Sequence, residues 1–401
     1  MTHKKIDYFF DILFALLLFS LSISVAIPNI IFGIISILFI FKKRKKIFSN
    51  TYINVLILFV TYLFIKAILL NSFINNILIY KHLIIILVSS ILIFQIKNII
   101  VAIKGYVFGV FLGVLISLGK IFNFYLEYKF FPFGNTSDVE NLILIHRPYL
   151  GFMCFIAIVL ISVLIGKLED KNKKLGYLSL TFIFIFFLFT IVARLALFLS
   201  LIFIFIKLFH YLKLSKTKLL ITFCSLIIII SSVFLLNKNL KNRFHIKDSY
   251  IETINVLKNQ EPRFVIWKCS LNQIFDINFN FFTGYSDRSN IDEKLTSCYG
   301  ETIENISKRD YYLKTRFNTH NQFFDIFLDG GIIGLSLFLV FLLFPFIYFR
   351  NNFEAVFTLL GLITFLGLEN LFFRQLGAYL FGILIPLFYN IITHSKNHEI
   401  R

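Results

Sequence analysis

The sequence predicts an all-α integral membrane protein, with about twelve transmembrane helices and one large, mostly helical extracytoplasmic loop between the ninth and tenth spans. Of the 401 residues, 58% are hydrophobic and only 15% are charged. Soluble domains have roughly 45–50% apolar and 25% charged residues. The mean hydropathy is +0.82, and apolar runs of about 20 residues, the length that crosses a bilayer, recur along the chain. A soluble fold of this length could not bury so much apolar surface.

The apolar runs divide the chain into three parts. Residues 1–236 form a membrane domain with spans 1–9, residues 237–331 form the loop, and residues 332–401 form a membrane domain with spans 10–12. Pro28 and Asn29 mark a tight turn that makes the first two spans a hairpin. The spans are predicted at about 8–26, 29–41, 52–70, 81–95, 99–118, 149–166, 176–193, 195–210, 219–236, 332–349, 353–369 and 376–393.

The basic residues set the orientation of these spans. The formal net charge is +18, but most Lys and Arg stand in short clusters between apolar runs, such as 42–46, 167–174 and 213–218. Short segments rich in Lys and Arg face the cytoplasm. With twelve spans these clusters fall on one side, so both termini are predicted inside and the 237–331 loop outside. Because the clusters act as topology signals, nucleic acid is not an expected partner.

The loop is predicted to be folded, and its cysteines to be paired. Its Tyr and Trp residues and short helical patterns, such as 263–275, are not typical of a disordered segment. Cys269 and Cys298 both lie in it, where an oxidising compartment permits a disulfide. Cys154 and Cys224 fall within spans and are expected to be buried apolar residues. No His or Cys group has the spacing of a zinc site, so no metal is predicted.

The most informative motif begins at His320. His320 and Asn321 are followed by nine residues and then by a Gly-x-x-Gly pattern that ends at Gly334. The histidine would lie where the loop meets the membrane surface. Asn321, Asp325 and Asp329 recur every four residues, so they would share one face of a short helix. The alternative is a surface helix with an ordinary solvated histidine.

Three arginines are candidates for binding an anion. Arg263 precedes Trp267 by four residues in the loop, and a guanidinium binds phosphate oxygens through two hydrogen bonds. Arg194 stands between two apolar runs, where an ionisable residue is costly and suggests function. Arg147 opens a predicted span on the outer face. Each could instead be an interfacial anchor or mark a turn.

The remaining charged residues are weaker candidates. Lys66 lies within a span and can snorkel or pair. Glu369 and Arg374 flank the last outer turn, where they would neutralise each other. Arg288 and Arg316 lie in the loop and are expected to be solvated.

Together these motifs resemble the O-antigen ligase and O-antigen polymerase superfamily of bacterial membrane proteins. The His-Asn motif matches the family's signature completely in spacing, and the segment from Arg263 to Trp267 resembles its loop. The family has an arginine at the turn that Arg194 occupies, commonly followed four residues later by leucine; here Phe198 takes that place. Many members also open a span as Arg147 does. The resemblance covers the whole architecture.

The resemblance implies a metal-independent, inverting glycosyl transferase of the bacterial inner membrane, without cofactors, that acts in lipopolysaccharide biosynthesis. Its donor would be a glycan on an undecaprenyl diphosphate carrier. Its acceptor would be a hydroxyl of lipid A-core or, in relatives, of a growing glycan or a protein. His320 would act as base toward that hydroxyl or orient it, and the arginines would bind the diphosphate. The implied catalytic residues are His320, Arg263 and Arg194. The implied substrate-binding residues are Arg147, Asn321 and Trp267.

Two alternatives stay open. An O-antigen or capsule polymerase shares the fold and the arginine pattern, but the complete His-Asn motif favours a ligase. A polysaccharide flippase or other transporter could also have about twelve spans, yet transporters tend to show repeated halves and broken helices at the midplane. Here one long outer loop dominates, so transport is the least favoured interpretation.

Overall fold

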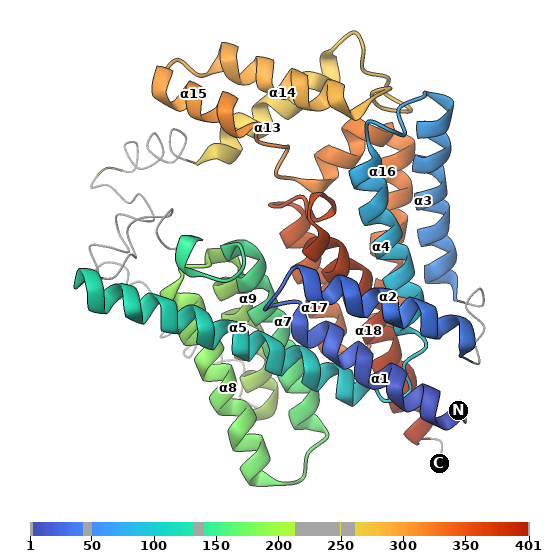
Figure 1. Cartoon of the computed structure of the whole chain (residues 1–401), viewed down its shortest axis with the longest axis vertical. Helices are drawn as coiled ribbons and strands as arrows, with labels where there is room; N and C mark the ends of the chain where they lie inside the picture. The colour runs from blue at the N-terminus through green and yellow to red at the C-terminus, as the bar shows by residue number, and fades with distance from the viewer. Residues whose placement is uncertain (1–2, 43–49, 131–139, 213–248, 250–260, 400–401) are drawn as a thin grey trace. The chain divides into compact units, whose positions relative to one another are not determined.

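A computed structural model describes residues 3–42, 50–130, 140–212, 249 and 261–399 (Figure 1). Within these ranges the regular elements are helices, and one isolated bridge joins Asn280 to Gly284. The all-helical fold predicted from the sequence is therefore confirmed for the described residues. The predicted span at 219–236 lies outside them.

The other predicted spans all fall on helices. Six helical stretches of the described residues are long and apolar enough to cross a membrane. They are α3 (Thr51–Leu69), α5 (Ile99–Tyr128), α7 (Arg147–Gly166), α8 (Lys171–Thr190), α16 (Gln322–Phe349) and the Gln375–Thr393 part of α18 (Gln375–Glu399). Three apolar helices are shorter: α2 (Ala26–Phe41), α4 (Ile77–Ile93) and α17 (Phe353–Leu366). The remaining two are α1 (His3–Ser20) and α9 (Arg194–Leu212). Twelve spans thus stay a prediction.

The helices belong to two compact units, each built from separate stretches of the chain. The first unit comprises residues 1–14, 29–102 and 261–401, and the second comprises residues 15–28 and 103–260. Each unit is described by itself below.

In the first unit, α18 packs closely on α4. A Cβ at Gly382 would lie only 2.8 Å from the carbonyl oxygen of Ile86, so the two backbones can approach because this position has no side chain. Beside them, α3 packs on α16 through aromatic rings: the centroids of Phe59 and Phe338 are 5.6 Å apart, and those of Tyr52 and Phe341 are 5.0 Å apart. Both ring pairs are tilted, and they bury aromatic surface between the two helices.

The same unit contains residues 261–321 of the predicted loop, here named the loop subdomain. It consists of α13 (Pro262–Asn272), the short η1 (Gln273–Phe275), α14 (Arg288–Thr302) and α15 (Ile306–Thr315), gathered beside one end of α16 in Figure 1. Asp287 and Asn305 cap α14 and α15, because their side chains accept hydrogen bonds from the first-turn amides. The prediction that this segment is folded and helical is confirmed.

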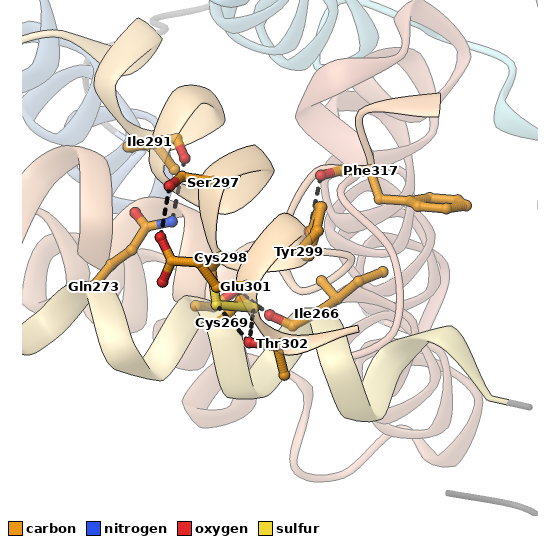
Figure 2. Close-up of a disulfide and its surroundings, with 11 residues drawn as sticks. Ile266, Cys269, Gln273, Ile291, Ser297, Cys298, Tyr299, Glu301, Thr302 and Phe317 are labelled. Carbon is orange, nitrogen blue, oxygen red and sulfur yellow. Dashed lines mark hydrogen bonds between the residues drawn. A yellow bond between two sulfur atoms is a disulfide. The ribbon is translucent and has the colours of Figure 1, made fainter. Parts of the chain in front are cut away.

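A disulfide joins α13 to α14. Cys269 and Cys298 are bonded, with 5.8 Å between their Cα atoms, as Figure 2 shows. The bond borders a small apolar core that includes Ile266, Leu295 and Tyr299. The predicted pairing of these cysteines is confirmed, and Cys154 is free and buried as expected.

In the second unit, α7 is the most buried helix and contacts both α8 and α9. Gly151 allows this approach, because a Cβ there would lie 2.8 Å from the Cβ of Ala193, just before α9. Small residues serve the same purpose in α5, where a Cβ at Gly105 would lie 3.0 Å from the Cα of Ala15.

Candidate active site

The His-Asn motif forms the N-terminal end of α16. Asn321 is the N-cap of this helix, and its side-chain oxygen accepts hydrogen bonds from the amides of Phe323 at 2.9 Å and Phe324 at 3.1 Å. These amides have no partner within the helix, so the cap satisfies them. Asn321 therefore has a structural role, whereas its implied role in substrate binding stays a prediction.

His320 immediately precedes this cap and has a constrained backbone. Its φ of +44° lies in the left-handed region, which costs a residue with a side chain of the order of 1–3 kcal/mol. Its amide donates to the side-chain oxygen of Asn318 at 3.0 Å, and its ring lies 5.7 Å from that of Phe317. Strained residues of this kind cluster at functional sites because surrounding contacts hold them in place. Here the contacts with Asn318 and Phe317 fix the direction in which the imidazole points.

The imidazole faces a buried carboxylate that is not among the predicted site residues. Nδ1 of His320 lies 3.5 Å from Oε2 of Glu369, whose side chain is 9% exposed. The other oxygen of Glu369 is 3.0 Å from Nη2 of Arg263. Glu369 thus lies between two of the predicted catalytic residues and brings them to one place. The expectation that it would only neutralise Arg374 is wrong.

Arg263 comes from the first turn of α13 in the loop subdomain. Besides its pair with Glu369, its Nε donates to the carbonyl oxygen of Leu368 at 3.3 Å, and its Nη1 lies 3.7 Å from Oε2 of Glu261. About a third of the side chain is exposed, at 32%. The guanidinium is therefore held in a fixed position while part of it still faces outward.

Trp267 follows Arg263 by one helical turn and packs α13 onto the first turn of α16. Its ring meets that of Phe324 edge to face, with 6.5 Å between centroids. Its indole nitrogen is buried, and no described residue accepts a hydrogen bond from it. Packing accounts for the position of Trp267, and its implied contact with substrate stays a prediction.

Buried polar contacts brace the segment of Glu369 against the segment of His320. Asn370 donates to the hydroxyl of Thr319 at 2.8 Å, and this hydroxyl donates to the carbonyl of Asn321 at 3.1 Å. The amide of Phe372 donates to the side-chain oxygen of Gln322 at 3.0 Å. These hydrogen bonds connect the two segments and so help to hold the carboxylate beside the imidazole.

The Gly-x-x-Gly part of the motif breaks α16. Gly331 has φ +62° and ψ −164°, a backbone conformation that essentially only glycine adopts. The next two amides leave the helix ladder: Ile332 donates to the carbonyl of Phe281 at 2.9 Å and Ile333 to that of Phe282 at 3.3 Å. The predicted boundary between loop and span, at residue 332, coincides with this break.

The carbonyls that the break releases all find other partners. The carbonyl of Leu328 accepts from the amide of Tyr285 at 2.8 Å. The carbonyl of Asp329 accepts from Nζ of Lys66, and that of Gly330 accepts from the hydroxyl of Tyr62 at 2.7 Å. An irregular helix within a membrane protein is stable only where its backbone groups are satisfied in this way. Two side chains of α3 therefore support the break.

The two aspartates of the motif are buried and paired. Asp329 lies 3.1 Å from Nζ of Lys66, and Asp325 pairs with Arg288, whose side chain is 6% exposed. Burial by itself would lower the pKa of Arg288, but the carboxylates outweigh it and raise that pKa. The expected solvation of Arg288 is therefore wrong, whereas Arg316 is exposed as expected. The helix face that Asp325 and Asp329 share is therefore buried in contacts within the protein, and both carboxylates stabilise the fold.

Arg147 and Arg194 belong to the second unit, where each is the first residue of a helix. Arg147 opens α7 and Arg194 opens α9. Because Gly151 of α7 packs against Ala193, the two helices begin at the same end of the pair. Both arginines are half-buried. Helix N-termini carry a partial positive charge and favour anions, so this end of the second unit combines two guanidinium groups with two such termini.

Residues 176–339 match the family model Wzy_C, described as O-Antigen ligase. This match, which covers less than half of the chain, supports the predicted resemblance to the O-antigen ligase-like superfamily. The matched segment runs from α8 into α16 and includes Arg194, Arg263 and His320, whereas Arg147 and Glu369 lie outside it. A search of curated proteins finds no match.

The match to this family model indicates a membrane enzyme of the O-antigen ligase or polymerase type. Sequence reasoning identified His320 and Arg263 but missed the carboxylate that joins them. The sequence feature that could have identified Glu369 is its position beside an apolar segment, where an ionisable residue suggests function. Its partner could not be inferred, because Arg374 is much nearer in the sequence than Arg263 or His320.

Proposed function

We propose that this protein is an O-antigen ligase-like transferase that moves a glycan from an undecaprenyl diphosphate carrier to a hydroxyl of lipid A-core without a metal. The observation that carries the proposal is the contact of one buried carboxylate, Glu369, with both His320 and Arg263. An imidazole held by a carboxylate is suited to accept a proton, because the carboxylate fixes its orientation and stabilises the imidazolium that forms. Histidine is also the side chain that most often transfers protons in catalysis.

The proposed reaction is a single displacement at the anomeric carbon. Nδ1–H of His320 would donate to Glu369, which leaves Nε2 to take the proton of the acceptor hydroxyl. The hydroxyl oxygen would then form the new glycosidic bond as the bond between the anomeric carbon and the diphosphate breaks. The configuration at that carbon inverts, and the carrier leaves as the diphosphate.

The arginines would hold the charge of the leaving diphosphate. Arg263 is partly exposed beside the imidazole, and Arg147 and Arg194 each begin a helix in the second unit. Guanidinium groups placed where negative charge develops lower the barrier to its departure. The proposed partners are therefore a lipid-linked glycan donor, a glycolipid acceptor and the surrounding membrane lipids.

The test is transfer in vitro by the purified protein, with carrier-linked donor and lipid A-core acceptor and no added metal. His320→Ala should lower turnover by about 10²–10⁴-fold, the usual contribution of a general base, and leave donor binding nearly intact. Glu369→Gln should lower turnover and change its pH profile, because an amide cannot stabilise the imidazolium. Arg263→Lys should weaken donor binding as well, because an ammonium lacks the paired donors of a guanidinium.

Arg316→Ala is the matched control, because Arg316 is exposed in the same loop subdomain. Near-normal turnover by folded His320→Ala would refute the proposed base. The glycan profile of a deletion strain separates the two transferase types: long chains left on the carrier support a ligase, whereas single repeats indicate a polymerase.

The proposed orientation places the loop in the periplasm of a bacterial inner membrane. Reporters fused after Lys174 should read cytoplasmic, and one fused at Asn290 should read external, because the basic clusters of short loops face inward. A cytoplasmic reading at Asn290 would exclude a donor presented on the outer face.

A further inference from the structure

Residues 275–283, here named the apolar hairpin, connect η1 to the start of α14 and expose large apolar side chains. Ile277 is 97% exposed, Phe275 88%, Phe282 64% and Phe281 52%. Single exposed apolar residues are ordinary, but several in one short segment mark a surface that something covers. Phe279 between them points inward and packs on Tyr285 with ring centroids 5.5 Å apart. The hairpin therefore has its own small anchor. Of the other four side chains, Phe281 also meets the rings of Phe282 and Phe327 edge to face, but all four keep more than half of their surface exposed.

The hairpin is attached to the end of a candidate membrane span. The carbonyls of Phe281 and Phe282 accept from the amides that follow Gly331 in α16. The two segments approach closely because Gly331 and Gly284 have no side chains: a Cβ at either would collide with the opposite backbone. This attachment lies within the candidate membrane span Gln322–Phe349. These contacts fix the position of the hairpin along the axis of the candidate span in α16.

The polar groups of the hairpin are largely satisfied within the loop subdomain. The side chain of Asp276 accepts from the amide of Asn278 at 2.8 Å and pairs with Lys294 at 2.7 Å. The side chain of Asn280 accepts from the amides of Phe282 at 2.9 Å and Thr283 at 3.1 Å. Unsatisfied amides and charges are what makes entry into a bilayer costly. The free-energy cost of moving this segment from water into a bilayer is therefore low.

A second apolar surface lies at the same end of this unit. The connection between α3 and α4 exposes Leu69 and Ile74. It is tied to the loop subdomain by a hydrogen bond of 2.5 Å from Asn75 to Asp287, four residues beyond the hairpin. Since α3 is itself a candidate span, the exposed apolar residues of both segments lie next to helices that are apolar enough to cross a membrane.

We propose that the apolar hairpin enters the bilayer interface and rests in it as a membrane anchor of the loop subdomain. The partner is the phospholipid leaflet on the side of the loop, at the boundary of head groups and acyl chains, where apolar side chains of interfacial segments reach about 5–10 Å deep. Lipid fits better than a protein partner, because the hairpin is attached to a candidate membrane span and its charged group is already paired. This proposal does not depend on the reaction proposed above.

The single tryptophan of the chain makes a direct test possible. In a Trp267→Phe parent, Ile277→Trp and Phe275→Trp each place one fluorophore on the hairpin. The full-length variants are reconstituted in nanodiscs of phosphatidylcholine, with or without bromine atoms on the upper acyl chain. Ile306→Trp is the matched control, because Ile306 is 65% exposed on α15 of the same subdomain but away from the hairpin. The disulfide and gel-filtration profile check that every variant is folded.

Brominated lipid should lower the emission of Ile277→Trp and Phe275→Trp by at least about twofold, since it quenches only fluorophores at acyl-chain depth. Ile306→Trp should be unaffected by bromine and quenched by acrylamide. Emission from the hairpin positions that ignores bromine and responds to acrylamide would place them in water and overturn the proposal. Emission that responds to neither quencher would mean that protein, such as a second copy of the chain, covers the hairpin, and would overturn it equally.

Discussion

Replacement of Arg288 by alanine should destabilise the protein strongly. The side chains of Arg288 and Asp325 are 6% and 4% exposed, and they form an ion pair between α14 and α16. Removing one partner of a buried pair leaves the other charged and unpaired, which costs about 3–5 kcal/mol. The guanidinium also lies 4.3 Å from the centre of the Phe373 ring, a contact that contributes roughly 0.5–2 kcal/mol. Arg288→Ala should therefore lower the free energy of unfolding by at least about 3 kcal/mol.

The measurement is unfolding in mixed micelles, followed by circular dichroism, for each variant beside the unmodified protein. Arg316→Ala is the control, because that arginine is exposed and its loss should change stability by no more than about 0.5 kcal/mol. The double variant Arg288→Met with Asp325→Leu should be more stable than Arg288→Ala alone, because it leaves no buried charge. An unfolding midpoint for Arg288→Ala equal to that of Arg316→Ala would refute the reasoning.

Three further predictions concern the same unit. Gly331→Ala should cost at least about 1–3 kcal/mol of stability from backbone strain alone, whereas Gly330→Ala should be milder because its neighbours are flexible side-chain ends; unfolding of the two variants compares them. Reduction of the 269–298 disulfide should lower stability by roughly 3–4 kcal/mol on the chain-entropy estimate, and equal unfolding with and without reductant would contradict it. A hydrogen bond from Lys294 lowers the pKa of Asp276. Lys294→Met should therefore cost about 0.2–1 kcal/mol at neutral pH. This difference should shrink as the pH falls below about 4, where the unfolded chain takes up the proton, and vanish below the lowered pKa of Asp276 in the folded protein, where the carboxyl is protonated in both states.

The sequence alone determined the features that depend on local pattern. Apolar runs of helix length predicted the helices, because each such segment must satisfy its own backbone hydrogen bonds in a membrane. The spacing from His320 to Gly334 predicted the motif, and its glycines mark the place where α16 breaks. Two cysteines in one polar loop predicted the disulfide. In each of these features, the residues that form the pattern lie within a few tens of positions of one another in the sequence.

Only the tertiary structure decided which charges meet. Glu369 lies 49 positions after His320 and 106 after Arg263, yet its carboxylate contacts both. Lys66 reaches Asp329 across 263 positions, and Arg288 reaches Asp325 from another helix. A charge pattern does not specify such partners, because a buried ion pair depends on which helix faces pack and not on distance along the chain. For this reason Arg288 could be mistaken for a solvated residue and Glu369 for the partner of Arg374.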